Sequence, residues 1–303
     1  MRRFSRTPCY SGPDDPERGN VRGVLSLGET VIIETVGGND HDYEAAGETR
    51  AGQITAANTH PRYSRPGGPF EIEGIAPDDW VAVEIINIDC APYGFYRNGG
   101  PNWGNWRCIA PVRDELIHFP PDMVVPVRPM IGVIQLESWA PNEIDHGGNM
   151  DFNSIQPGST VHIRAQKPGG LLSLGDVHAR MGDGELTGAG VEIDSAVTLK
   201  VERSSGFPCS SPVVETTGVV ESPEEWLTGA RAGEWGEALK AAWREMVALL
   251  VDQYEISVEQ ANLIVGTIGD ARPGFATGYM GDYLTCQIAI TKELTRTGQP
   301  YKP

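Results

Sequence analysis

The chain has 303 residues, 40% of them hydrophobic, and a formal net charge of −17. That length accommodates one large or two moderate domains, and the hydrophobic fraction is sufficient for a packed core. The acidic balance argues against a nucleic-acid partner and against docking on anionic membranes, because both require a basic surface. With 37 glycines and 23 prolines, the composition favours many short strands joined by turns.

The cysteines and the N-terminal sequence indicate the compartment. The five cysteines are odd in number, widely spaced and form no C-x-x-C pair, so we expect no disulfide framework and a reducing cytoplasm. The first twenty residues include basic side chains without an apolar stretch behind them, unlike a secretory signal. No segment is apolar over the length that a membrane-spanning helix requires. We therefore expect a soluble, cytoplasmic protein.

Three segments share one pattern, a tight turn followed by alternating apolar positions. They read LSLGETVIIET from Leu25, IAPDDWVAVEIINI from Ile75 and IQPGSTVHIRA from Ile155. The alternation predicts half-buried strands, and the repetition suggests a duplicated antiparallel β-unit. The alternative is coincidence, since a turn followed by a strand is common in any β-rich protein. Further strands are predicted at 186–193, 196–202 and 284–291.

Helices are predicted only near the C-terminus. Ser222 followed by Pro223 and Glu225 matches a helix N-terminus. Ser257 with Gln260 predicts a second helix, which runs through Ile268 to Gly269. The first helix has one apolar face, formed by Trp235, Leu239, Trp243, Met246, Leu249 and Leu250. We expect the two tryptophans of this face to lie in the core.

These elements predict a mainly β fold with a smaller α+β C-terminal part. We expect a β-sandwich or barrel-like arrangement of duplicated units over residues 1–219. Residues 220–303 should form a helical hairpin and a final strand packed on that domain.

The densest polar cluster is GDVHARMGDGE, residues 175–185. Strand alternation would place Asp176 and His178 on one face. Asp183 and Glu185 could join them if the chain turns between the two pairs. Carboxylate oxygens with an imidazole nitrogen form a common ligand set for zinc and similar divalent ions. The alternative is a surface turn beside an ordinary hydrogen-bonded pair.

Two further clusters lie next to predicted strands. DHGGNMD, residues 145–151, offers His146 and Asp151 as metal ligands and Asn149 as a donor to a carbonyl oxygen. Its glycines allow the backbone to approach a ligand. GGNDHDYE, residues 37–44, offers a second set of acids and a histidine, although such a loop could simply be solvated. The candidates from these two clusters are His146, Gly147, Gly148, Asn149, Asp151, Asp40, His41 and Asp42.

Several motifs resemble the acetamidase/formamidase family. They are RPMIGVI (128–134), HGGNMDFNSIQPGS (146–159) and GDVHARMGDGELTGAGVEI (175–193), supported by GPFEIEGIAPDDWVAVEI (68–85) and EQANLIVGTIGDAR (259–272). The resemblance is collinear over most of the chain. It departs from the family pattern in a short link between Gly132 and His146, in the inserted segment PGFATGYMGDY (273–283) and in the aromatic segment 93–106.

The resemblance implies a homo-oligomeric, metal-dependent amide hydrolase that cleaves a formamide- or acetamide-like substrate to a carboxylate and ammonia. The cofactor would be a divalent metal ion, zinc or calcium. By motif, the implied metal ligands are His146, Asp176, His178, Asp151, Asp40 and Asp42. Glu185 or Asp183 would be the base, Asn149 would hold the oxyanion, and the implied substrate contacts are Gly147, Gly148 and His41.

Three alternatives stay open at the level of the sequence. The same metal site could hydrolyse a larger amide or another C–N bond. The chain could instead be a non-catalytic β-sandwich whose metal only braces loops, with the aromatic segment 93–106 binding a partner. A cupin-like oxygenase is disfavoured, because no H-x-H-like pair with a suitably spaced glutamate is present.

Overall fold

The structure is a computed structural model that describes residues 1–5, 21–37, 53–54, 66–98, 106–119, 121–137, 144–218, 223–276 and 283–294. Its N-terminal strands are β1 (Arg2–Phe4), β2 (Gly23–Leu25), β3 (Thr30–Thr35), β4 (Gln53–Ile54), β5 (Gly67–Ile72), β6 (Trp80–Asn98), β7 (Trp106–Arg113), β8 (Leu116–Phe119) and β9 (Met123–Pro126). The later elements are β10 (Met130–Leu136), β11 (Gly147–Asn149), β12 (Ser159–Arg164), β13 (Leu172–His178), β14 (Glu192–Ser204), β15 (Val213–Thr216), β16 (Glu225–Ala232), α1 (Trp235–Tyr254), α2 (Val258–Ile268), β17 (Asp270–Pro273) and β18 (Leu284–Thr291).

Most of the strands lie in two sheets that are connected to each other, and β7 extends from β6 toward β4, β8 and β9. In the first, β6 is central: it pairs antiparallel with β12 on one side and with β14 on the other. This sheet continues from β12 to β15, and from β14 through β3 to β1. In the second sheet, β13 lies between β10 and β5, with β11 beyond β10 and β2 beyond β5. The two sheets are joined where β13 meets β14, at the pair His178 and Glu192.

One apolar core draws on residues of both sheets. The first sheet contributes Val83 and Leu199, and the second contributes Ile134 and Leu174, all fully buried. Within the part of the chain that the structure describes, the strand pairs form no closed ring, so the sheet does not close into a barrel. The prediction of a mainly β fold with a sandwich-like body and a C-terminal helical hairpin is confirmed.

The three turn-and-strand segments also adopt their predicted local structure. Each turn is followed by a strand, namely β3, β6 and β12. Gly28, in the first turn, has φ +81°, and Gly158, in the third, has φ +87°. Glycine adopts this left-handed conformation without the steric cost that a Cβ imposes, which explains its place in both turns. β12 and β6 are neighbours in the sheet, with Ser159 opposite Ile85.

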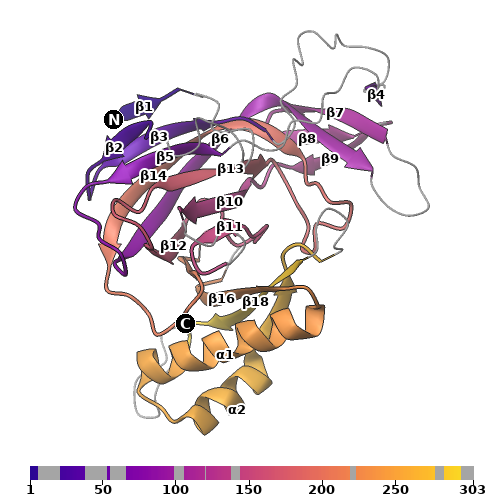
Figure 1. Ribbon diagram of the computed structural model, residues 1–303. Helices are drawn as coiled ribbons and strands as arrows, with labels where there is room; N and C mark the ends of the chain where they lie inside the picture. Colours follow the sequence, from indigo (N-terminus) through magenta and orange to yellow (C-terminus); the bar gives the residue numbers. More distant parts are fainter. Residues whose placement is uncertain are drawn as a thin grey trace.

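The C-terminal part extends the first sheet. β16 pairs with β15 and with β18, and β18 also pairs with β17. α1 and α2 pack beside β16 and β18, as Figure 1 shows. A second apolar core lies between the helices and these strands, built around Met246, Leu249, Val265 and Ile290. Because β15 and β16 pair across the proposed boundary, the division into 1–219 and 220–303 stays a prediction.

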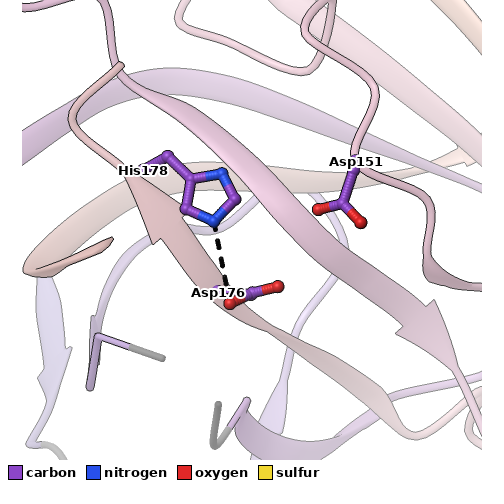
Figure 2. Close-up of side chains that lie close together, drawn as sticks. All are labelled: Asp151, Asp176 and His178. Atoms are coloured by element: carbon purple, nitrogen blue, oxygen red, sulfur yellow. Dashed lines mark ion pairs between the residues drawn. The ribbon is translucent and has the colours of Figure 1, made fainter. Parts of the chain in front are cut away.

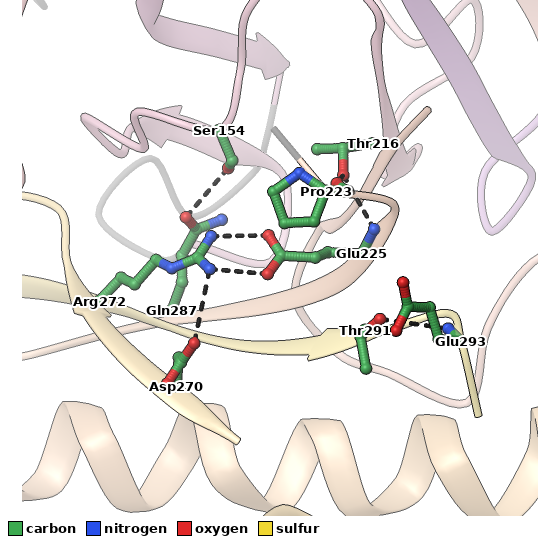
Figure 3. A network of polar contacts seen from close by, with 9 residues as sticks. All are labelled: Ser154, Thr216, Pro223, Glu225, Asp270, Arg272, Gln287, Thr291 and Glu293. Carbon is green, nitrogen blue, oxygen red and sulfur yellow. Dashed lines mark hydrogen bonds and ion pairs between the residues drawn. The ribbon is translucent and has the colours of Figure 1, made fainter. Parts of the chain in front are cut away.

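A polar network ties this part together (Figure 3). Both terminal nitrogens of Arg272 lie 2.7 Å from the carboxylate oxygens of Glu225, which is 5% exposed. Such a two-pronged pair fixes orientation as well as neutralising charge. Ser154 Oγ donates to Gln287 Oε1 at 3.0 Å, which connects the sandwich to β18. The strands of the C-terminal part are therefore held directly behind the segment 150–154.

Two predictions about the helical region need correction. The expected helix start at 222–225 is wrong for its described residues, because Glu225–Ala232 is strand β16. Pairing with β15 and β18 outweighs the local capping pattern there. Trp243 is 40% exposed and is not a core residue, since the buried face of α1 consists of Ala238, Ala242, Met246, Leu249 and Leu250. The second helix is confirmed: Ser257 and Gln260 form the predicted capping box.

The strand predicted at 186–193 begins only at Glu192 and continues as β14. Leu186 is 72% exposed and lies in the loop between β13 and β14. The strands predicted at 196–202 and 284–291 are confirmed. Among the described residues, none of the helices has the length and apolarity needed to cross a membrane.

Candidate active site

Acidic side chains gather around His178 at the junction of the two sheets. Asp176 and His178 end β13, and Glu192 begins β14 opposite His178. Glu185 comes from the loop that connects these two strands. Asp151 comes from the turn after β11, where its backbone N–H donates to the carbonyl of Gly132 on β10.

The ligand-capable atoms of this cluster are close together. His178 Nε2 lies 3.2 Å from Glu192 Oε1 and 3.9 Å from Asp176 Oδ1. One set consists of ligand-capable atoms of Asp151, Asp176 and His178, which all lie within 4.8 Å of one another. Figure 2 shows these three side chains. A second set, from His178, Glu185 and Glu192, meets the same limit. All five residues are at most 9% exposed.

Two glycines provide the space that this cluster occupies. A Cβ on Gly132 would lie 2.5 Å from Asp151 Oδ1 and 3.0 Å from Asp176 Oδ2. A Cβ on Gly190 would lie 2.7 Å from Cγ of the His178 ring. Neither separation is compatible with normal packing, so any other residue would displace a member of the cluster.

Three of the acids also have an uncommon backbone conformation. Asp151, Asp176 and Glu185 have φ values of +51°, +54° and +41°. For residues other than glycine this region costs free energy, and it persists where the surrounding structure enforces it. Such residues concentrate at functional sites. The surrounding structure therefore holds the backbone of these three acids in an uncommon conformation.

Burial and mutual repulsion dominate the electrostatics of the cluster. Burial raises the pKa of Asp151 well above its ordinary range, and Glu185 and Asp176 raise it further. Burial also raises the pKa of Asp176, and Glu192 adds to this effect. For His178, burial alone would lower the pKa, but Glu192 and Asp176 outweigh it and hold the pKa well above its ordinary value. The cluster therefore sets a single imidazole among four buried carboxyl groups.

A divalent cation fits this arrangement chemically. Asp151 Oδ1 is buried and has no hydrogen-bond partner among the described residues. Buried carboxylates are normally hydrogen-bonded, paired with a cation or bound to a metal. Carboxylate oxygens plus one imidazole nitrogen are the donors that zinc and related ions bind. The residues of the cluster are thus suitable ligands for such an ion.

The structure separates other predicted site residues from the cluster. The carbonyl of His146 accepts a hydrogen bond from the backbone N–H of Leu136 on β10. On the same strand, Gly132 stands opposite Asp176, and it lies four residues away from Leu136. Four strand residues span roughly 13 Å. The imidazole Nδ1 lies 2.9 Å from Asp145 Oδ1 instead. His146 is therefore not brought to the cluster, contrary to the expectation from the sequence.

Asp183 points away from the cluster as well. It is exposed, and its Oδ1 accepts a hydrogen bond from Asn153 Nδ2 at 3.3 Å. The turn that was expected to unite Asp183 with Glu185 instead buries Glu185 alone. Asp40, His41 and Asp42 lie outside the described residues.

Gly147 and Gly148 were predicted to contact the substrate, but Gly147 packs against β10. Gly147 has φ +87° and its N–H donates to Ile144, so it is not free for a ligand. A Cβ on Gly147 would lie 2.2 Å from the carbonyl oxygen of Ile134. Gly147 therefore allows β11 to approach β10, and β11 in turn carries Asn149 beside Asp151.

Comparison with known proteins agrees with the fold and the motifs. The model of the Acetamidase/Formamidase family matches residues 138–268. A 137-residue segment is 28% identical to the formamidase of Methylophilus methylotrophus. The crystal structure of an acetamidase from Bacillus halodurans has a TM-score of 0.78 at 25% identity, covering 96% of this chain and 97% of that one. Residues 138–268 of this chain are thus similar to the acetamidase/formamidase family.

A second solved relative extends the agreement. The structure of a predicted acetamidase/formamidase from Thermoanaerobacter tengcongensis has a TM-score of 0.81 at 25% identity, covering 95% of both chains. The alignments to two curated relatives span only 23% and 34% of those proteins' lengths. These relatives support the prediction of an amidase-type hydrolase. The family match also spans all five clustered residues, from Asp151 to Glu192.

Four residues near the site were not predicted from the sequence. Glu192 lies within the family-like stretch 175–193, and its position between buried valine and isoleucine could have marked it. Gly132 interrupts a run of bulky apolar residues in a strand, which signals a close approach. Gly190 and Tyr283 carry no local signal, because their contacts come from segments distant in the sequence or from the loop geometry.

Proposed function

We propose that this protein hydrolyses a small carboxamide, of the formamide or acetamide kind, to a carboxylate and ammonia. The observation that carries the proposal is the buried cluster of four carboxylates around His178, in a chain related to amidases. We further propose that Asp151, Asp176 and His178 hold a divalent cation. The imidazole favours zinc over calcium, since calcium prefers oxygen ligands alone.

Unactivated amides resist hydrolysis because resonance stabilises the carbonyl and the amide nitrogen is a poor leaving group. A cation in this cluster would polarise the carbonyl and make water more acidic. Side chains of the protein would supply the other requirements, namely further ligands and proton transfer. Glu192, whose Oε1 lies 3.2 Å from His178 Nε2, would be a further carboxylate ligand, because it belongs to the second set of ligand-capable atoms.

Glu185 is the residue that we assign to proton transfer. Its ligand-capable oxygen belongs to the set within 4.8 Å of His178 and Glu192. A carboxylate there can take a proton from the attacking water and deliver it to the departing nitrogen. Asp183 is less suitable for this role because it lies on the surface, paired with Asn153.

The test is Glu185→Gln, which keeps the shape and removes the proton acceptor. We expect ammonia release from formamide and acetamide to fall at least about a hundredfold, the usual contribution of a general base. The matched control is Glu202→Gln, which alters an exposed glutamate paired with Lys200 on β14. Metal content by mass spectrometry should stay the same in both variants. Unchanged turnover in Glu185→Gln would exclude this residue as the base.

The alternative of a larger amide also has a structural argument. The segment 273–283, which departs from the family pattern, contributes Tyr283, which contacts Asn149, and Phe275, whose ring packs against that of Tyr283. Aromatic rings at this position would restrict or extend the space beside the cluster. A panel of aliphatic and aromatic amides with ammonia detection separates the two substrate classes, since preference for formamide over every bulkier amide excludes the larger one.

We propose in addition that the protein is a homo-oligomer in the cytoplasm. The family resemblance supports the assembly. The thiols of Cys90, Cys209 and Cys286 are free, which is consistent with a reducing compartment.

A further inference from the structure

Tyr283, which directly precedes β18, reaches the candidate site from the C-terminal part of the chain. Its hydroxyl accepts a hydrogen bond from Asn149 Nδ2 at 3.0 Å. The same Asn149 nitrogen donates to Asp151 Oδ2 at 2.9 Å. Tyr283 is thus two hydrogen bonds away from a residue of the acidic cluster.

These two bonds use the whole donor capacity of the Asn149 side chain. An asparagine amide nitrogen carries two N–H groups, and an ionised carboxylate can only accept. The amide orientation is therefore fixed by its two acceptors. Asn149 has no further N–H to offer to a developing oxyanion, so we assign it to holding Asp151 rather than to contacting the substrate.

The bond from Asn149 decides which oxygen of Asp151 faces the cluster. With Oδ2 engaged, Oδ1 is the oxygen left for a cation, and it is buried without a partner among the described side chains. Gly132 adjoins Oδ1 so closely that a Cβ there would lie at 2.5 Å. The carboxylate is thus fixed on both sides.

Tyr283 is itself held firmly from two directions. The guanidinium carbon of Arg231, on β16, lies 3.4 Å from the centre of the Tyr283 ring. The ring of Phe275 packs against it with a centroid separation of 5.8 Å. A cation over an aromatic face and a tilted aromatic pair are both attractive arrangements. The hydroxyl position therefore depends on the strands of the C-terminal part.

We propose that Tyr283 is a positioning residue that, through Asn149, orients Asp151 to present its Oδ1 to a divalent cation. This inference rests on the cation binding of the proposed function. It gives a function to one residue of the segment 273–283, which departs from the family pattern. It also makes the C-terminal strands part of the site.

The test compares Zn²⁺ affinity among variants of the full chain after removal of bound metal, by competition with a chromogenic chelator. Tyr283→Phe keeps the ring contacts with Arg231 and Phe275 and removes only the hydroxyl. We expect its Zn²⁺ affinity to fall about tenfold, the lower end for residues that orient a ligand. Tyr254→Phe, at the end of α1, is the matched control and should bind Zn²⁺ as the unaltered protein does.

A double-mutant cycle identifies the route. Asn149→Ala should lower Zn²⁺ affinity about 10- to 100-fold, and adding Tyr283→Phe should lower it no further, because both changes interrupt one pathway. Unchanged affinity in Tyr283→Phe, which can be measured even if Asn149→Ala does not fold, would overturn the inference. Losses that multiply in the double variant would also overturn it. Failure of the unaltered protein to take up Zn²⁺ would reject the cation of the proposed function, and this inference with it.

Discussion

Gly132 shows how a residue without a side chain shapes the candidate site. It lies on β10 between Asp151 on one side and Asp176 on the other, and both carboxylates approach its Cα. A backbone oxygen of Asp176 is also within 2.9 Å of the place where a Cβ would stand. Backbone cannot rotate away as a flexible side chain can, so the crowding cannot be relieved cheaply.

Gly132→Ala should therefore weaken cation binding and lower the free energy of unfolding. Overpacking of this kind costs roughly 1–3 kcal/mol. We expect Zn²⁺ affinity to fall at least about tenfold, because Asp151 or Asp176 must move. Chelator competition and urea unfolding measure the two effects.

The control is Gly182→Ala, since a Cβ on Gly182 meets nothing within 4 Å. It should retain both Zn²⁺ affinity and stability. If Gly132→Ala matched this control in both measurements, the two carboxylates would not be packed around residue 132 as described.

At the scale of elements, ion pairs connect strands that the sequence keeps far apart. Glu215 on β15 hydrogen-bonds His162 on β12 at 3.3 Å and is also paired with Lys292, which follows β18. The hydrogen bond from His162 and the ammonium of Lys292 lower the pKa of Glu215 to about 2, although partial burial opposes the shift. One carboxylate thus links the sandwich to the last strand.

This pKa predicts a defined pH window. Because the native pKa lies below the ordinary value of 4.5, the ion pair stabilises the fold above pH 4.5 and is lost as the pH falls toward about 2. Glu215→Gln should lower the free energy of unfolding by roughly 1 kcal/mol near neutral pH, since the side chain of Glu215 is 31% exposed and its ion pair is partly screened by solvent. The difference should shrink progressively in acid.

Denaturant unfolding at a series of pH values measures this difference. Glu237→Gln on α1 is the control, because its pair with Lys240 is exposed on both sides. That variant should match the unaltered protein within about 0.5 kcal/mol at every pH. A penalty in Glu215→Gln that did not change between neutral and acidic solution would contradict the assigned role.

For the whole molecule, the buried acidic cluster links stability to cation binding. Raised pKa values for Asp151 and Asp176 mean that their ionised forms cost stability when no cation is present. A ligand that binds only the folded state stabilises it by about 2.7 kcal/mol at a hundredfold excess over its Kd. The cluster should therefore respond strongly to an added ion.

Thermal unfolding with and without Zn²⁺ tests this response. We expect Zn²⁺ to raise the Tm of the metal-free protein by several degrees, and chelator to reverse the effect. Asp176→Asn should abolish the increase. Its metal-free Tm should equal or exceed that of the unaltered protein, because one repelling charge is removed and asparagine tolerates a positive φ.

If Zn²⁺ raised the Tm of Asp176→Asn as much as that of the unaltered protein, the ion would bind elsewhere. A shift in the unaltered protein without ammonia release from any amide would favour the non-catalytic alternative, in which the metal only braces loops. The two readouts together therefore separate binding from catalysis.

The sequence predicted local structure correctly where that structure depends on residues a few positions apart. Asp176 and His178 share a face because strand alternation requires it, and Ser257 with Gln260 caps α2 through contacts three residues apart. It was wrong at Glu225, where a good local capping pattern yields to pairing with β15 and β18. His146 was predicted as a ligand from a short motif, but the register of β11 on β10 places it along the strand from Asp176.

The sequence by itself determined the β-rich class, the capped second helix and the family resemblance, and it named four of the five residues that cluster, Asp151, Asp176, His178 and Glu185. These follow from periodicity, capping and motifs, which operate over a few residues or are recognised as strings. Only the tertiary structure excluded Asp183 and His146 from the cluster, added Glu192 and Gly132, and brought Tyr283 to Asn149 across 134 positions. Such contacts depend on strand register and sheet packing, which are decided by burial of the whole core rather than by any local pattern.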